Sequence, residues 1–259
     1  MNDSIRSIYR EECDIWGYPQ EYKGLKIYPI KIKDIEIQNL FYRNFAYPKN
    51  YIPDKNILKM SYLKFLLYIV QRGVDAEDKG KELLKLLKYL FREDDIEFNY
   101  KEIKDSDDFD IVIKTGDVSI TESDFEDIRA ISLEQNGLSL EYVESYNPEL
   151  EDKLAFINKD APNVNFADEV FTFCSMMKKT LPEIENYTIY QFRNQMEKLI
   201  TLHDYDVYRP LEVSGQISIK GGQIKHYLYN SKKSSGRYDS VLISKDEFVK
   251  KGEVFQVAQ

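Results

Sequence analysis

The chain has 259 residues, of which 42% are hydrophobic and 31% are charged, and its formal net charge at pH 7 is −9. This apolar content is enough for a hydrophobic core, which excludes wholesale disorder, and the length fits one large domain or two modest ones. The acidic balance argues against a generally basic, nucleic-acid-binding protein.

The first part of the chain combines one short strand with several helices. An apolar run predicts a strand over residues 25–30, and a helix follows over 34–44. Two prolines disfavour helix in the residues before them, so we expect a loop over 47–53. The apolar spacing then predicts helices over 61–72 and 79–91.

The middle part has the pattern strand, turn, strand, helix. A β run at residues 111–113 is followed by a turn at 115–117 and by a second alternating segment that ends at Ile120. A helix is predicted over 121–135, where an Asn-Gly pair stops it. Residues 138–155 are polar, and we expect them to be helical in part.

The last part begins with helices and ends with strands. Helices are predicted over 166–179 and 188–202, and a β-hairpin over 217–226 around a Gly-Gly turn. A strand at 241–243 and a short helix from Ser244 follow. The predicted fold class is therefore α+β, mostly helical, with β-hairpins in the middle and near the C-terminus.

Four helix starts share one local pattern. An apolar residue precedes Ser or Thr, and Phe follows four positions after the Ser or Thr, which is the hydrophobic staple. The capping residues are Ser61, Thr121, Thr188 and Ser244. Thr188 and Ser244 are also followed three residues later by Gln or Glu, which completes a capping box.

Two groups of apolar side chains are predicted to lie in the core. The first is centred on Phe192, which shares a helix face with Met196, Leu199 and Ile200. The second surrounds Cys174, where a buried and unreactive cysteine is expected. Its members are Phe171, Phe173, Cys174, Met176 and Met177.

Cysteine and histidine are too few for most metal sites. Cys13 and Cys174 lie far apart, and the histidines are His203 and His226. No Cys-x-x-Cys or His-Glu-x-x-His spacing occurs, so the sequence predicts neither a disulfide framework nor a metal site. Because no nucleophile–base pattern is present either, we expect no enzymatic activity and no cofactor.

No segment is typical of a secretory signal or of a membrane span. Residues 1–6 carry charges and no apolar run. The most apolar stretch, residues 62–70, contains Lys64 and is shorter than the roughly 20 residues that cross a bilayer. We therefore expect an intracellular protein without a membrane partner.

Charge divides the chain into three blocks. Residues 93–152 contain 20 acids and only 4 bases, whereas the flanking parts are mildly basic. Such asymmetry predicts a separate module or an electrostatically marked face. We accordingly predict an N-terminal strand–helix block (1–92), an acidic hairpin–helix module (93–160) and a C-terminal helical block with a hairpin (161–259).

The acidic module supplies the first candidate binding residues. On the predicted helix that starts at Thr121, four acids are expected to face solvent while Phe125, Ile128 and Ile131 are buried. These acids are Glu122, Glu126, Asp127 and Glu134. They could mimic the charge of DNA, steer a basic partner protein, or serve solubility alone.

A basic and aromatic segment near the C-terminus supplies the second set. No acid lies between positions 214 and 238, and tyrosines alternate with the basic residues. The candidate residues are Lys225, Lys232, Lys233 and Arg237. Such a segment could be a solvated face, contact an acidic protein surface, or bind single-stranded nucleic acid, in that order of preference.

Several segments resemble tail-morphogenesis proteins from phages of Gram-positive bacteria. They are GLKIYPIKIKD at 24–34, ILKMSYLKFL at 57–66, YTIYQF at 187–192, VSGQI at 213–217 and KHYL at 225–228. Tail-morphogenesis proteins of this kind include tail assembly chaperones. They are non-enzymatic and hold tape-measure or tail-tube proteins while the tail is built.

The resemblance implies a protein-binding factor in phage tail assembly. Its expected partners are the tape-measure or tail-tube proteins, and its expected location is the cytoplasm of the host cell. Nucleic acid is not an expected partner. The alternative function, based on the acidic module, is a nucleic-acid-mimicking inhibitor of a host DNA- or RNA-binding enzyme.

Overall fold

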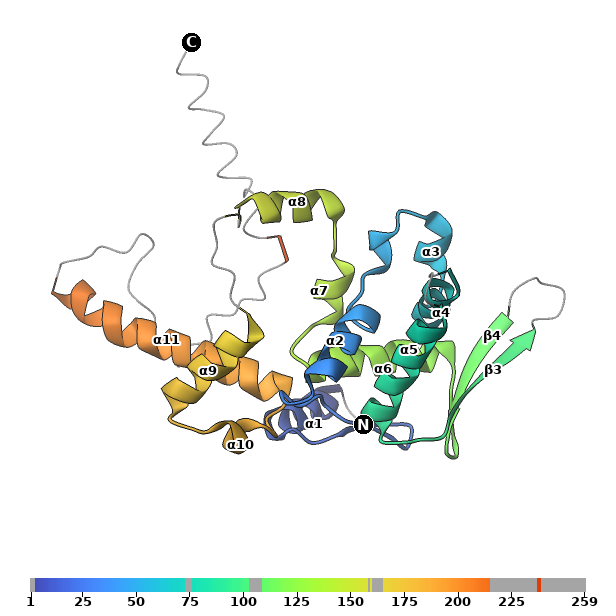
Figure 1. The fold of residues 1–259 in the computed structure, drawn as a ribbon, viewed down its shortest axis with the longest axis horizontal. Coiled ribbons are helices and arrows are strands. Elements are labelled where there is room, and N and C mark those ends of the chain that lie inside the picture. Colours follow the sequence, from blue (N-terminus) through green and yellow to red (C-terminus); the bar gives the residue numbers. More distant parts are fainter. Residues whose placement is uncertain are drawn as a thin grey trace, which may run out of the picture.

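In the described part of the chain in the computed structural model, helices make up most of the residues, and two small antiparallel sheets complete an α+β fold, as predicted (Figure 1). The structure describes residues 3–72, 76–102, 109–157, 159, 165–214 and 237–238. The helices are α1 (Asp3–Trp16), α2 (Ile35–Asn44), the 3-10 helix η1 (Lys49–Tyr51), α3 (Lys55–Lys59), α4 (Tyr62–Arg72), α5 (Ala76–Phe91), α6 (Glu122–Gln135), α7 (Leu140–Glu144), α8 (Pro148–Ile157), α9 (Phe166–Met177), α10 (Leu181–Ile184) and α11 (Ile189–Val213). The strands are β1 (Gln20–Tyr22), β2 (Leu25–Ile27), β3 (Ile96–Glu102), β4 (Phe109–Thr115) and β5 (Val118–Ile120).

Three of the four predicted N-caps are confirmed. The side chain of Thr121 accepts a hydrogen bond from the amide of Asp124, and that of Thr188 accepts one from Gln191; both sites are full capping boxes. Ser61 Oγ accepts from the amide of Lys64, 3.3 Å away, at the start of α4. The fourth predicted cap, Ser244, lies outside the described residues.

The two sheets only partly match the predicted strands. β2 ends at Ile27 rather than at residue 30, and it pairs with β1, a strand that the sequence did not indicate. In the second sheet the order is β3-β4-β5, so the predicted middle hairpin gains an unpredicted strand, β3. The predicted hairpin over 217–226 and the strand over 241–243 lie outside the described residues.

Residues 28–32 leave the sheet because their backbone groups bond to three helical regions. The amide of Tyr28 donates to the carbonyl of Leu90 in α5, and that of Ile30 donates to Asn136 Oδ1 just after α6. The amide of Ile189, at the start of α11, donates to the carbonyl of Ile30. This extended segment thus joins elements that are far apart in the sequence.

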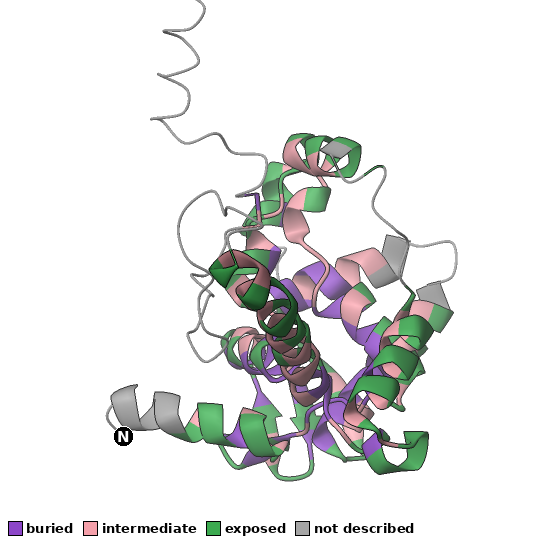
Figure 2. Cartoon of the chain, turned by 90° about the vertical axis from the view of Figure 1, so that its left-hand side faces the viewer, coloured by how far each residue is buried: buried purple, intermediate pink, exposed green. Residues whose placement is uncertain are grey.

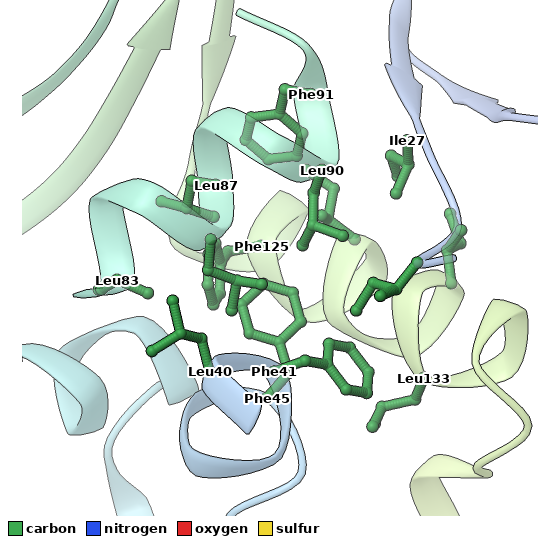
Figure 3. Packing of buried hydrophobic residues seen from close by; sticks show 14 of the residues in the cluster. Ile27, Leu40, Phe41, Phe45, Leu83, Leu87, Leu90, Phe91, Phe125 and Leu133 are labelled. Atoms are coloured by element: carbon green, nitrogen blue, oxygen red, sulfur yellow. The ribbon is translucent and has the colours of Figure 1, made fainter. Parts of the chain in front are cut away.

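Helix α6 lies in the middle of the hydrophobic core. Figure 3 shows side chains of α2, β2, α5 and α6 pointing toward one another, among them Phe41, Ile27, Leu87 and Phe125. The core continues to Phe192 in α11, so its members come from all three blocks of the sequence. The division of the chain into three separate blocks stays a prediction.

The side chains around α9 and α11 follow the predicted pattern in part. Phe192 is buried, and its ring lies 5.1 Å from that of Phe173 between centroids. The prediction of burial is wrong for three residues, since Ile200, Phe171 and Met176 are exposed. No other element of the described chain covers these faces of α9 and α11. Cys174 was predicted to be buried, but it is only partly buried, packed against the edge of the core.

Helix α11 is longer than predicted. The sequence placed its end at residue 202, but the helix continues to Val213 and contains Pro210. The last turns carry apolar side chains that face solvent, including Val207, Tyr208 and Val213. The C-terminal end of α11 therefore extends away from the core (Figure 1).

Gly17, between α1 and β1, is fixed by two constraints. Its φ is +71°, and a Cβ there would lie 2.9 Å from Thr188 Cγ2. We expect Gly17→Ala to cost about 1–2 kcal/mol through the backbone alone and more through the clash. Gly24 is the matched control for the backbone cost. Its φ is +84°, and a Cβ added there would have no heavy atom within 4 Å apart from its chain neighbours. Urea unfolding that gives equal losses for Gly17→Ala and Gly24→Ala would contradict the role of the Thr188 contact.

Candidate protein-binding surfaces

Two of the four candidate acids on α6 hold the fold together. Glu126 Oε1 accepts a hydrogen bond of 2.6 Å from the amide of Tyr62, one of the otherwise unpaired amides at the start of α4. Glu122 Oε1 accepts from the amide of Ile111, 3.0 Å away, and lies 3.5 Å from Lys64 Nζ. Both side chains are only partly exposed, so the prediction that they face solvent is wrong.

The other two acids are exposed, as predicted, but they also have partners within the chain. Asp127 Oδ2 accepts a 2.6 Å hydrogen bond from the hydroxyl of Tyr22, and Glu134 lies 3.6 Å from Arg10. The apolar face of the helix is buried as predicted, at Phe125, Ile128 and Ile131. All four acids thus lie on α6, but each has a partner within the chain, so they do not form a row of unpaired acidic side chains.

Asp124, which the sequence did not single out, is the most strongly bound carboxylate of this helix. Burial by itself would raise its pKa, but hydrogen bonds from Lys23, Thr121 and Tyr22 outweigh that effect and hold the pKa well below its usual range. Burial and the hydrogen bonds to Asp127 and Asp124 raise the pKa of Tyr22 in turn. This cluster anchors the β1–β2 hairpin to the start of α6.

The second predicted set contains one described residue. Lys225, Lys232 and Lys233 lie outside the described residues. Arg237 is described, and its Nε lies 2.5 Å from Glu151 Oε1 in α8. Arg237 therefore contacts the acidic module within one chain, a pairing that no local sequence signal indicated.

An aromatic surface at the end of α1 is the clearest exposed apolar feature that the sequence analysis missed. We define the α1 aromatic surface as Tyr9, Ile15, Trp16 and Tyr18. Trp16 is 62% exposed, Tyr18 57% and Ile15 51%. The signal was present, because apolar residues recur at positions 5, 8, 9, 15 and 16 with helical spacing and Trp16 is the only tryptophan.

Other side chains of α1 and one carbonyl near its C-terminal end attach the helix to the body of the protein. Cys13 is buried, Asp14 accepts a 2.8 Å hydrogen bond from Gln20, and Gln191 in α11 donates to the carbonyl of Ile15. The side chains of Tyr9, Ile15 and Trp16 are exposed, and the described part of α1 is drawn mostly as exposed in Figure 2. The α1 aromatic surface is thus presented on a fixed helix.

Burial of Asp14 raises its pKa to about 6. The Asp14 carboxyl therefore holds its proton more tightly in the folded than in the unfolded state. Above about pH 6 the carboxyl is charged in both states, and its charge lowers the stability of the fold. This loss of stability disappears as the pH falls toward 4. Asp14→Asn keeps an acceptor for Gln20 and should stabilise the fold by about 1 kcal/mol at pH 7.5, after allowance for solvent screening. Urea unfolding at pH 7.5 and pH 4 tests this, and an equal gain at both pH values would contradict it.

A cleft of about 610 Å³ lies between α4 and the second sheet. Its lining includes Lys59, Lys64, Phe109 and Glu122.

The described residues contain no group of three or more His, Cys, Asp or Glu side chains that could hold a metal ion. Among the described residues, no helix is both long enough and apolar enough to cross a membrane.

Comparison with protein-family models gives a match in the C-terminal part of the chain. Residues 158–232, which include α9, α10 and α11, match the family model of the YomV second domain. This family is phage-derived, from a Bacillus prophage, and the match agrees with a phage protein. Searches of curated proteins and of solved structures give no match.

Proposed function

We propose that this protein is a non-enzymatic factor that binds a tape-measure or tail-tube protein during phage tail assembly in the host cytoplasm. The observation that carries the proposal is the α1 aromatic surface. Trp and Tyr are the residue types that contribute most to protein–protein binding when they are buried in an interface. Here they are exposed, on α1 or just after it, and α1 is attached to the rest of the chain by hydrogen bonds and by the buried Cys13.

The charges around this surface indicate the chemistry of the partner. Glu11 and Glu12 in α1 and Glu21 in β1 are exposed, and Glu12 lies on the same side of the helix as Ile15 and Trp16. A partner segment with an apolar centre and a basic rim would complement them, and opposite charges at a rim raise the rate of association more than the affinity. The phage origin of the YomV family supports a phage protein as that partner.

The test is direct binding to the tape-measure and tail-tube proteins of the same phage after co-expression. We expect one of them to co-purify with the wild type, and Trp16→Ala with Tyr18→Ala to weaken binding at least tenfold while the melting temperature stays unchanged. Leu58→Ala, an exposed apolar residue on α3, is the control and should bind as the wild type does. Equal binding by the aromatic variant, or no binding to either tail protein, would overturn the proposal.

The alternative, an inhibitor that mimics nucleic acid, receives less support from α6. Glu122 and Glu126 are engaged with backbone amides, so their replacement by lysine would damage the fold as well as the charge. Capture of a host nuclease or polymerase that duplex DNA competes away, with a steep dependence on salt, would favour this alternative.

A further inference from the structure

Arg237 is enclosed by aromatic rings and a carboxylate from the acidic module. Its guanidinium carbon lies 4.9 Å from the ring centroid of Tyr142 and 5.1 Å from that of Tyr146. Its Nε donates to Glu151 Oε1, 2.5 Å away, and Nη1 donates to the carbonyl of Tyr142 at 3.4 Å. Cation–π contacts together with a charged hydrogen bond are the usual means of selecting a guanidinium.

The next residue, Tyr238, is held as specifically. Its side chain is buried, and its hydroxyl donates to Glu151 Oε1 at 2.9 Å. The same hydroxyl accepts from the amide of Asn147, 2.5 Å away. Asn147 precedes α8, and its own side chain caps that helix by accepting from the amide of Glu149.

The receiving residues come from one short stretch of the chain. Tyr142 lies in α7, Glu151 lies in α8, and Tyr146 and Asn147 lie between them. The ring of Tyr146 also contacts that of Tyr51, which extends the aromatic wall. The hydrogen bond from Arg237 lowers the pKa of Glu151, so the carboxylate is charged whenever the site is filled at neutral pH.

We propose that Tyr142, Tyr146, Asn147 and Glu151 form a recognition site for an arginine–aromatic peptide segment, which the chain fills with its own Arg237–Tyr238. We call these four residues the Arg–Tyr site. The rings and carboxylate take the guanidinium, and the backbone of Asn147 together with Glu151 takes the phenol. This inference does not depend on a role in tail assembly.

The test uses the full chain with Arg237→Ala and Tyr238→Ala, which empties the Arg–Tyr site. The probe is a fluorescein-labelled peptide with the sequence of residues 233–242, followed by anisotropy. We expect the emptied chain to bind it and the wild type to bind it at least tenfold more weakly, because a tethered competitor has an effective concentration of the order of millimolar. A probe with Lys in place of Arg should bind the emptied chain at least tenfold more weakly.

A matched pair of carboxylates separates recognition from general attraction. Adding Glu151→Gln to the emptied chain should reduce peptide binding at least tenfold, whereas adding Glu149→Gln, on the same helix, should leave it unchanged. No binding to the emptied chain, equal binding to the wild type, or equal effects of the two glutamine variants would overturn the proposal.

A second measurement does not depend on emptying the site. Tyr238→Phe removes only the hydroxyl, and the amide of Asn147 then loses its acceptor. We expect its hydrogen exchange to become at least tenfold faster than in the wild type. Unchanged exchange would show that residues 237–238 do not occupy the site in solution.

Discussion

Arg129→Ala should lower the free energy of unfolding by about 2–4 kcal/mol, because it removes a buried side chain and leaves the carbonyl of Phe45 without its donor, although Glu144 is 35% exposed. The side chain of Arg129 is 1% exposed. Its Nε donates to the carbonyl of Phe45 at 2.9 Å, and its Nη1 lies 2.7 Å from Glu144 Oε1. The guanidinium also stacks 3.4 Å from the ring centroid of Tyr62. Alanine would leave these three groups without their partner.

Urea unfolding followed by circular dichroism measures this loss. Arg10→Ala is the control, because the Arg10–Glu134 pair is partly exposed, at 30% and 44%, and should contribute less than about 1 kcal/mol. Arg129→Lys keeps the charge but lacks the planar group that stacks on Tyr62, so we expect an intermediate loss. A loss for Arg129→Ala no larger than that for Arg10→Ala would show that the buried network is not required.

Phe192→Ala should cost about 3 kcal/mol, because a large aromatic side chain is removed from a packed site that cannot fully collapse. The ring of Phe192 contacts those of Phe173 and Phe166, with centroid distances of 5.1 and 5.8 Å. Loss of this ring would also loosen the junction of α9 and α11.

Ile200→Ala is the control on the same helix. Ile200 is 48% exposed, so its replacement should change the free energy of unfolding by less than about 0.5 kcal/mol. Both variants are compared with the wild type by thermal and urea unfolding. Similar melting temperatures for all three proteins would contradict the burial of Phe192.

Helix starts were predictable because their signals are local. The caps at Ser61, Thr121 and Thr188 depend on residues within four positions, and the capping interactions occur where the sequence placed them. The end of α11 was not predictable in the same way. The helix passes Pro210 and continues to Val213, although proline in a helix interior removes a backbone hydrogen bond.

The candidate binding residues were predicted less well than the helices. Charge counting located the acidic module, but it could not tell a solvated carboxylate from Glu126, which accepts from an amide 64 positions away in the chain. Likewise Arg237 was assigned to a basic surface, while its observed partner is Glu151. Such pairings depend on which elements the fold brings together.

The sequence by itself determined the α+β class, the local helix starts and the apolar face of α6, because each follows from spacing within a few residues. Only the tertiary structure decided that Arg129 is buried, that Glu122 and Glu126 hold neighbouring elements, and that the aromatic side of α1 faces outward. The physical reason is that burial and hydrogen bonding of a polar side chain depend on groups distant in the chain, whose positions are set by the packing of the whole core.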